Sequence, residues 1–127
     1  FGDILKNNLQ NEIDSLVGAA KTAYKDELNK QNSKVTNMAN VCINADYLIN
    51  NDYIAKTGSF DGSVLIKKDG TIEFWIKNSN YHFTGANYET YSIDNAKNTE
   101  TGADFTQCGK KSTVTVTCFN TNSCKAK

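Results

Sequence analysis

Apolar residues in the first thirty positions recur at steps of three and four, the spacing of one face of an α-helix. The spacing predicts a helix over residues 1–30 whose apolar face contains Phe1, Leu5, Leu9, Ile13, Leu16, Ala20, Tyr24 and Leu28. With Ala19 and Ala23 this face spans roughly 180°, whereas a helix that covers one sheet needs about 100°. We therefore expect the helix to pack on its own sheet and, along its other flank, on a second partner.

The beginning of this helix lacks the usual capping signals. A cap residue with an acid three positions later commonly precedes the first apolar residue of a helix. Here Phe1 already belongs to the apolar face, Asp3 is the one candidate cap, and Lys6 occupies the position of the acid. Either Asp3 caps an ordinary N-terminal helix, or the helix is cut from a longer one. We favour the longer helix.

Residues 31–57 are predicted to connect the helix to a sheet. Residues 35–45 are ambiguous, although several of their apolar positions have helical spacing. The stretch that follows is predicted to form a loop with one or two helical turns around Leu48. A strand entry is predicted at Tyr53 and Ile54.

From residue 58 the pattern changes to the period of two that is typical of β-strands. Asp69-Gly70 separates two such runs, residues 63–68 and 71–77, and predicts a hairpin with a type I′ turn, because Gly accepts a positive φ. One face of the hairpin carries Val64, Ile66, Ile72, Phe74 and Ile76, and the opposite face carries Glu73, Trp75 and Lys77.

Further strands are predicted at residues 81–84 and 88–93, so that short connections produce an antiparallel meander over 58–93. Residues 94–106 are polar and predict an irregular surface loop. Residues 112–119 alternate strictly and predict a last strand with Val114, Val116 and Cys118 on its buried face.

These elements predict one α+β domain over residues 1–127, in which a long N-terminal amphipathic helix packs on an antiparallel sheet of about four strands. Residues 1–30 form the helix, 31–57 the connection, 58–93 the meander, and 94–127 a C-terminal loop, last strand and disulfide-bounded tail.

Composition narrows the functional classes. The formal net charge is zero, so the domain has no basic footprint for nucleic acid. No apolar run approaches the ~20 residues of a membrane span, and no signal peptide is present. All basic residues are Lys, which leaves no planar guanidinium for bidentate phosphate binding. The Lys and Asn bias suggests an AT-rich bacterial genome.

The four cysteines, Cys42, Cys108, Cys118 and Cys124, lack the spacing of a zinc site and favour two disulfides in an exported domain. Three connectivities are possible. Because Cys118 points to the predicted core, we favour Cys42–Cys118 with Cys108–Cys124, and Cys118–Cys124 is the main alternative. Each bridge would add about 2–4 kcal/mol.

Candidate chemistry is sparse. His82, the single imidazole, has no nucleophile or orienting partner nearby in sequence, so a surface histidine on a strand is expected. An oxygen-ligand Ca²⁺ site could form from Asp94, Glu100 and Asp104, but their spacing favours a solvated loop. A sugar-stacking surface could form from Trp75, Tyr81, Tyr88 and Tyr91, but packing against the sheet is favoured.

Lys110-Lys111 is predicted to be a solvated pair in a turn. No Asn-x-Ser/Thr acceptor site for N-glycosylation occurs. We expect no enzyme activity, no cofactor and no bound metal.

The helix spine from Leu5 to Leu28, the segment Tyr47–Ile54, the hairpin from Gly62 to Ile76 and the C-terminal strand with its cysteines together resemble a type IV pilin. The resemblance covers essentially the whole chain and is strongest to pilins of Gram-positive, clostridia-like bacteria. The diagnostic processed apolar N-terminal segment of the family is not in this sequence.

The resemblance implies a structural subunit, made as a protein of the cytoplasmic membrane and polymerised into a cell-surface filament. Its implied partners are other copies of itself, the pilus assembly machinery with its inner-membrane platform, and host or abiotic surfaces. Residues 32–57 and 108–124 would meet neighbours or face outward. A pseudopilin of a secretion or competence system is the close alternative, and a secreted sugar-binding module is a more distant one.

Overall fold

The computed structural model describes residues 2–30, 40–55, 60–99 and 105–110. The elements in these ranges are α1 (Gly2–Leu28), β1 (Val41–Asn44), α2 (Ala45–Asn50), β2 (Asp61–Ile66), β3 (Ile72–Lys77), β4 (Tyr81–Asn87), η1 (Ile93–Asn95), β5 (Lys97–Asn98) and η2 (Cys108–Lys110). The predicted strand at 112–119 lies outside the described residues, as do Phe1, Glu100, Asp104, Lys111, Cys118 and Cys124.

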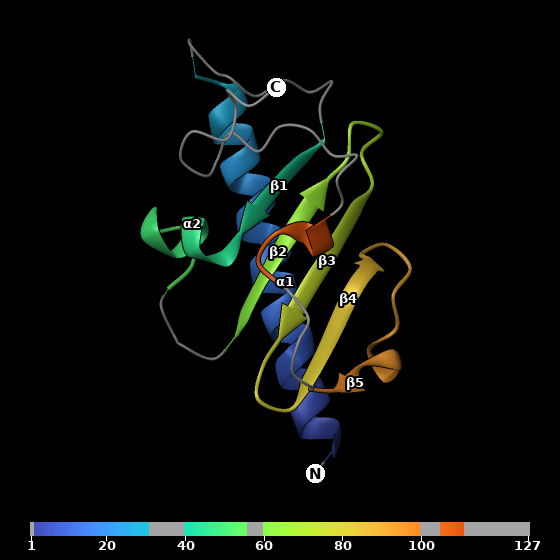
Figure 1. Ribbon diagram of the computed structural model, residues 1–127. Helices are drawn as coiled ribbons and strands as arrows, with labels where there is room; N and C mark the ends of the chain where they lie inside the picture. The colour runs from blue at the N-terminus through green and yellow to red at the C-terminus, as the bar shows by residue number, and fades with distance from the viewer. Residues whose placement is uncertain (1, 31–39, 56–59, 100–104, 111–127) are drawn as a thin grey trace.

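The predicted α+β class is confirmed, with the long helix α1 lying across one face of an antiparallel sheet (Figure 1). In the described residues the sheet has five strands rather than about four, in the order β1-β2-β3-β4-β5. Every neighbouring pair is antiparallel and consecutive in sequence, which makes the sheet a meander.

The main core lies between α1 and the sheet. Seven helix residues are buried there: Leu9, Ile13, Leu16, Val17, Ala19, Ala20 and Ala23. They face the inward side chains of β1 to β4, which include Ile43, Val64, Phe74 and Phe83. The three alanines leave room for the helix backbone to approach its neighbours closely. No helix in the described residues is long and apolar enough to cross a membrane.

The extra strand, β1, falls in the stretch that the sequence left ambiguous. Its four residues pair with β2 in a register that sets Val41 opposite Ile66 and Ile43 opposite Val64. A strand this short is selected by tertiary pairing with β2, because its own sequence is too short to display a period.

The predicted strand entry at Tyr53 and Ile54 is wrong. The short helix around Leu48 exists as α2, and it ends in a Schellman motif. Asp52 adopts a positive φ of 65° and donates its N–H to the carbonyl of Ile49, while the Tyr53 N–H returns to the carbonyl of Leu48 at 2.8 Å. The backbone N–H of Tyr53, which a strand would use for pairing, is therefore bonded to the end of α2.

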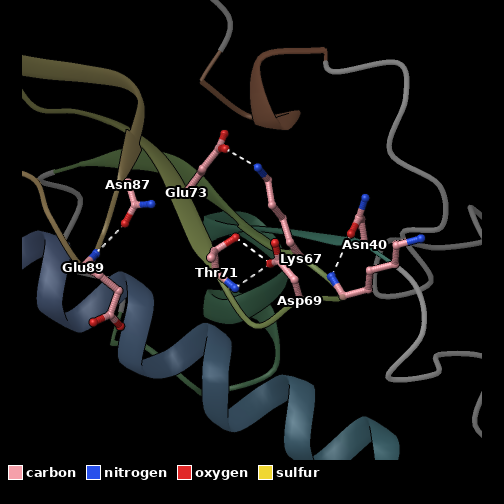
Figure 2. A network of polar contacts seen from close by, with 8 residues as sticks. Asn40, Lys67, Asp69, Thr71, Glu73, Asn87 and Glu89 are labelled. Carbon is pink, nitrogen blue, oxygen red and sulfur yellow. Dashed lines mark hydrogen bonds and ion pairs between the residues drawn. The ribbon is translucent and has the colours of Figure 1, made fainter.

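The predicted hairpin between β2 and β3 is confirmed, but its turn type is wrong. Lys67 donates its N–H to the carbonyl of Thr71 at 2.9 Å, so the loop has three residues, 68–70. Of these only Gly70 has a positive φ, 92°, whereas a type I′ turn needs two. The Asp69 carboxylate instead accepts hydrogen bonds from the N–H and hydroxyl of Thr71 at 2.9 and 2.7 Å (Figure 2), which stabilise the longer loop.

The predicted strand at 88–93 is also wrong, because the chain turns at the end of β4. The side-chain oxygen of Asn87 accepts a hydrogen bond from the backbone N–H of Glu89 at 2.8 Å (Figure 2). The backbone carbonyl of Asn87 accepts a hydrogen bond from the N–H of Tyr91 at 2.9 Å. The rings of Tyr88 and Tyr91 then stack 5.9 Å apart beside the core. The following polar stretch contains η1 and β5 rather than only irregular loop.

Two glycines in these elements should respond in opposite directions to the same substitution. In Gly62→Ala the new Cβ would collide with the backbone oxygen of Trp75 and lie 3.1 Å from Leu16, whereas at Gly18 on α1 a Cβ meets no atom of the described structure within 4 Å. Urea denaturation should show Gly62→Ala destabilised by about 1–3 kcal/mol and Gly18→Ala stabilised by about 0.5–1 kcal/mol. Equal effects at the two positions would contradict the packing described for β2.

Candidate assembly surfaces

The seven predicted packing residues of α1 are buried to different degrees. The four at the middle of the helix are completely buried: Leu9, Ile13, Leu16 and Ala20. The three nearer its ends are half-buried: Leu5, Tyr24 and Leu28. Both flanks of the apolar face have partners within the domain, because α1 contacts the sheet and also α2, whose Ala45 and Leu48 join the same core. Any surface that α1 offers to another molecule therefore lies on its other side.

Tyrosine hydroxyls fasten the edges of α1 to the rest of the domain. Tyr53 donates to the carboxylate of Asp26 at 2.6 Å, and Tyr88 donates to that of Asp14 at 2.8 Å. The hydrogen bond to Asp26, assisted by burial, raises the pKa of Tyr53 to about 12. The hydrogen bond to Asp14 and burial raise the pKa of Tyr88 to about 12 as well.

Two further contacts hold the N-terminal half of α1. Asn78, between β3 and β4, donates its side-chain N–H to Glu12 at 2.8 Å. The Lys6 ammonium lies 5.9 Å from the ring centroid of Tyr81, within the range of a cation–π contact. These contacts and the tyrosine hydrogen bonds fix the helix at several points along its length.

The opposite face of the sheet carries a second, smaller apolar cluster. It consists of Cys42, Leu65, Trp75, Phe105 and Cys108. Residues 105–110, which we call the clip, cross this face in front of β2 and β3 (Figure 1). The sheet is thus covered on both sides, by α1 on one and by the clip on the other.

Ser63 on β2 connects the clip to the sheet by hydrogen bonds. Its completely buried hydroxyl donates to the carbonyl of Phe105 at 2.8 Å and accepts the N–H of Cys108 at 2.9 Å. One side chain therefore pairs two backbone groups that burial would otherwise leave without partners. Nothing in the local sequence of Ser63 indicated this role.

A disulfide between Cys42 and Cys108 attaches the clip covalently to β1. The favoured sequence-based pairing, Cys42–Cys118 with Cys108–Cys124, is therefore wrong. Cys118 and Cys124 lie outside the described residues, so the alternative pairing of these two cysteines stays a prediction. The error arose because Cys108 lies in a polar stretch whose buried position depends on contacts distant in sequence. The disulfide indicates an extracytoplasmic location.

Trp75 lies under the clip and is only 4% exposed. At Gly109, whose φ is +64°, an added Cβ would come within 2.5 Å of the indole nitrogen, so the clip backbone rests directly on the ring. Trp75 is consequently removed from any sugar-stacking surface, while Tyr81, Tyr88 and Tyr91 are half-buried beside the main core.

The polar candidates are dispersed in the structure. His82 is half-buried rather than open on the surface, with its ring 5.7 Å from that of Phe105, and its Nδ1 has no hydrogen-bond partner in the described residues. Asp94 is exposed at η1. The described part of the chain contains no cluster of three metal-ligating side chains. Lys110 ends η2.

The tip of the β2–β3 hairpin is held by polar contacts (Figure 2). Lys67 forms a cross-strand ion pair with Glu73 at 2.7 Å, and Glu73 raises the pKa of Lys67 by hydrogen bonding and charge. The backbone N–H of Lys68 donates to Asn40 at 2.8 Å, which ties the tip to the start of β1.

The comparisons with known proteins give no relatives: no family model, no curated protein and no solved structure matches this chain.

The raised pKa values of Tyr53 and Tyr88 predict how stability depends on alkaline pH. Unfolded tyrosine titrates near pH 10, so the two hydrogen bonds contribute fully below that pH. Their contribution is lost as pH rises towards the folded value of about 12. A double variant, Tyr53→Phe with Tyr88→Phe, should be less stable than wild type at pH 8, by at most about 1 kcal/mol per exposed bond. Urea denaturation should show the difference shrinking above pH 10, and a constant difference would contradict the assignment.

The disulfide and the clip should control the environment of Trp75, the single tryptophan of the chain. Replacing Cys42 and Cys108 by Ala should shift its fluorescence to longer wavelength and lower stability by about 2–4 kcal/mol, because the bond closes a long loop. Mass spectrometry of non-reduced wild-type digests should recover the two cysteines in one linked peptide pair. A variant with unchanged emission and stability would contradict the role of the clip as a cover.

Proposed function

We propose that this chain is the head domain of a structural subunit, specifically a major pilin, of an extracellular type IV pilus that supports surface adhesion, twitching motility or aggregation. The observation that carries the proposal is the length of α1. Its 27 residues measure about 40 Å, whereas the six-residue strands it crosses measure about 20 Å.

The N-terminal end of α1 extends past the edge of the sheet (Figure 1), and Leu9 is the first helix residue that is completely buried. A helix that only covered its own sheet would need no such extension. A protruding helix fits the role of a stem that joins the head to a filament core built from the stems of neighbouring copies.

The second support for the proposal is the disulfide between Cys42 and Cys108. A subunit in an extracellular fibre experiences no reducing cytoplasm, and the Cys42–Cys108 bond is stable in that setting. This bond also favours a pilin over a secretion pseudopilin, because many such pseudopilins use a Ca²⁺-binding C-terminal loop in place of a disulfide. Burial of Trp75 argues against the sugar-binding alternative that used this side chain.

The proposed partners are other copies of the subunit, the assembly machinery with its membrane platform, and host or abiotic surfaces. The proposed location is the cell-surface filament, reached from a precursor in the cytoplasmic membrane. No catalytic role and no cofactor are proposed.

The proposal predicts that the gene encodes an apolar segment of about 20 residues ahead of Phe1. With that segment present, cells that carry the assembly machinery should form fibres visible by electron microscopy. Leu16→Asp should abolish both the fold and the fibres, because it places a charge in the main core. The control Asn98→Asp, at an exposed position on the edge strand β5, should retain both. A gene without the apolar segment, or wild-type cells without fibres, would contradict the proposal.

A further inference from the structure

The solvent-facing side of α1 carries one unusual side chain. Ile4 is 62% exposed, and it is the only exposed large hydrophobic residue in the described part of the chain. Its neighbours on this side, including Asn7 and Asn11, are polar. Single exposed hydrophobic residues are common on protein surfaces. Ile4 therefore indicates a contact only if the molecule also has an apolar site that fits it.

A groove lies farther along α1, between this helix and residues 52–55 and 60. It has a volume of about 650 Å³, and its apolar lining residues are Ala19, Ile54, Ala55 and Phe60. Gly18 also lines it, where no described atom comes within 4 Å of an added Cβ, so the wall is open at this point.

Three of the six polar side chains that line the groove have hydrogen-bond partners within the domain. Tyr53 donates to Asp26, Glu12 accepts from Asn78, and the Thr22 hydroxyl donates to the carbonyl of Gly18 at 3.1 Å. These three groups need no external hydrogen bonds, and the apolar lining beside them can receive an apolar side chain.

The exposed Ile and the groove lie on the same strip of the helix. At about 100° per residue, Ile4 and Gly18 are separated by roughly 40° around the axis, and at 1.5 Å per residue by about 21 Å along it. We propose that Ile4 of one copy inserts into this groove of a second copy, with the two helices parallel and staggered by about 21 Å.

This contact joins two different patches, so each copy still offers a free Ile4 and a free groove after binding. Such head-to-tail contacts continue without closing and generate fibres. The parallel direction rests on the proposed function, because stems that leave one membrane all point the same way. A single contact of this size is weak, and repetition along a fibre would strengthen it.

Two pairs of variants test the contact in the soluble domain. Gly18→Phe fills the groove and Gly18→Ala is its matched control, since both remove the same glycine from the helix. Ile4→Asn removes the inserted side chain and Ile4→Val keeps an apolar one. Thermal denaturation should show all four folded, because Ile4 is exposed and Gly18 borders open space.

Sedimentation velocity at concentrations up to about 1 mM should show wild type, Gly18→Ala and Ile4→Val growing beyond dimers. Gly18→Phe and Ile4→Asn should each remain monomers, while their equimolar mixture should stop at dimers, since only one intact Ile4 can meet one intact groove. A monomeric wild type, or one that stops at closed dimers, would overturn the proposal.

The same variants separate this contact from the proposed function. Normal fibres from cells that express full-length Gly18→Phe would overturn the contact and leave the filament subunit standing. Absence of fibres from wild type would reject the filament subunit, whatever the soluble domain does.

Discussion

Burial of β2 on both of its faces is the constraint on which the rest of the structure depends. Five consecutive residues of this strand, Gly62–Ile66, are buried, so neither face of the sheet can be left to solvent. Helix α1 covers one face with a continuous apolar stripe. The other face is covered by the clip, which Ser63 and the Cys42–Cys108 bond hold in place.

The elements with a strong local signal were predictable from the sequence. The helical spacing of apolar residues, repeated along the whole of α1, predicted the helix. The alternation on both sides of Asp69-Gly70 predicted the β2–β3 hairpin. Both signals come from side chains that are close in the chain. The two strand predictions that were wrong failed for local reasons that the hydrophobic pattern does not reveal. Asp52 closes α2 with a positive φ, and Asn87 turns the chain after β4. Strand β1 forms because it pairs with β2, a contact between segments that are distant in sequence. A short stretch of sequence therefore could not predict it.

The second face of the sheet was the least predictable part. Phe105 is an isolated apolar residue in a polar stretch, and Ser63 resembles any strand serine, yet the two meet across a separation of 42 residues. The disulfide pairing was mistaken for the same reason, because it depends on where the clip lies. The wide apolar face of α1 also has a simpler explanation than a second molecule, since α2 occupies its other flank.

A stem role for α1 therefore rests on its exposed side and its protruding end. Labelling of an Ile4→Cys variant with a thiol-reactive probe that leaves disulfides intact tests this most directly, in the isolated domain and in intact fibres. The account predicts rapid labelling of the isolated domain, where Ile4 is 62% exposed, and protection in the fibre. Equal labelling of the two forms would contradict it.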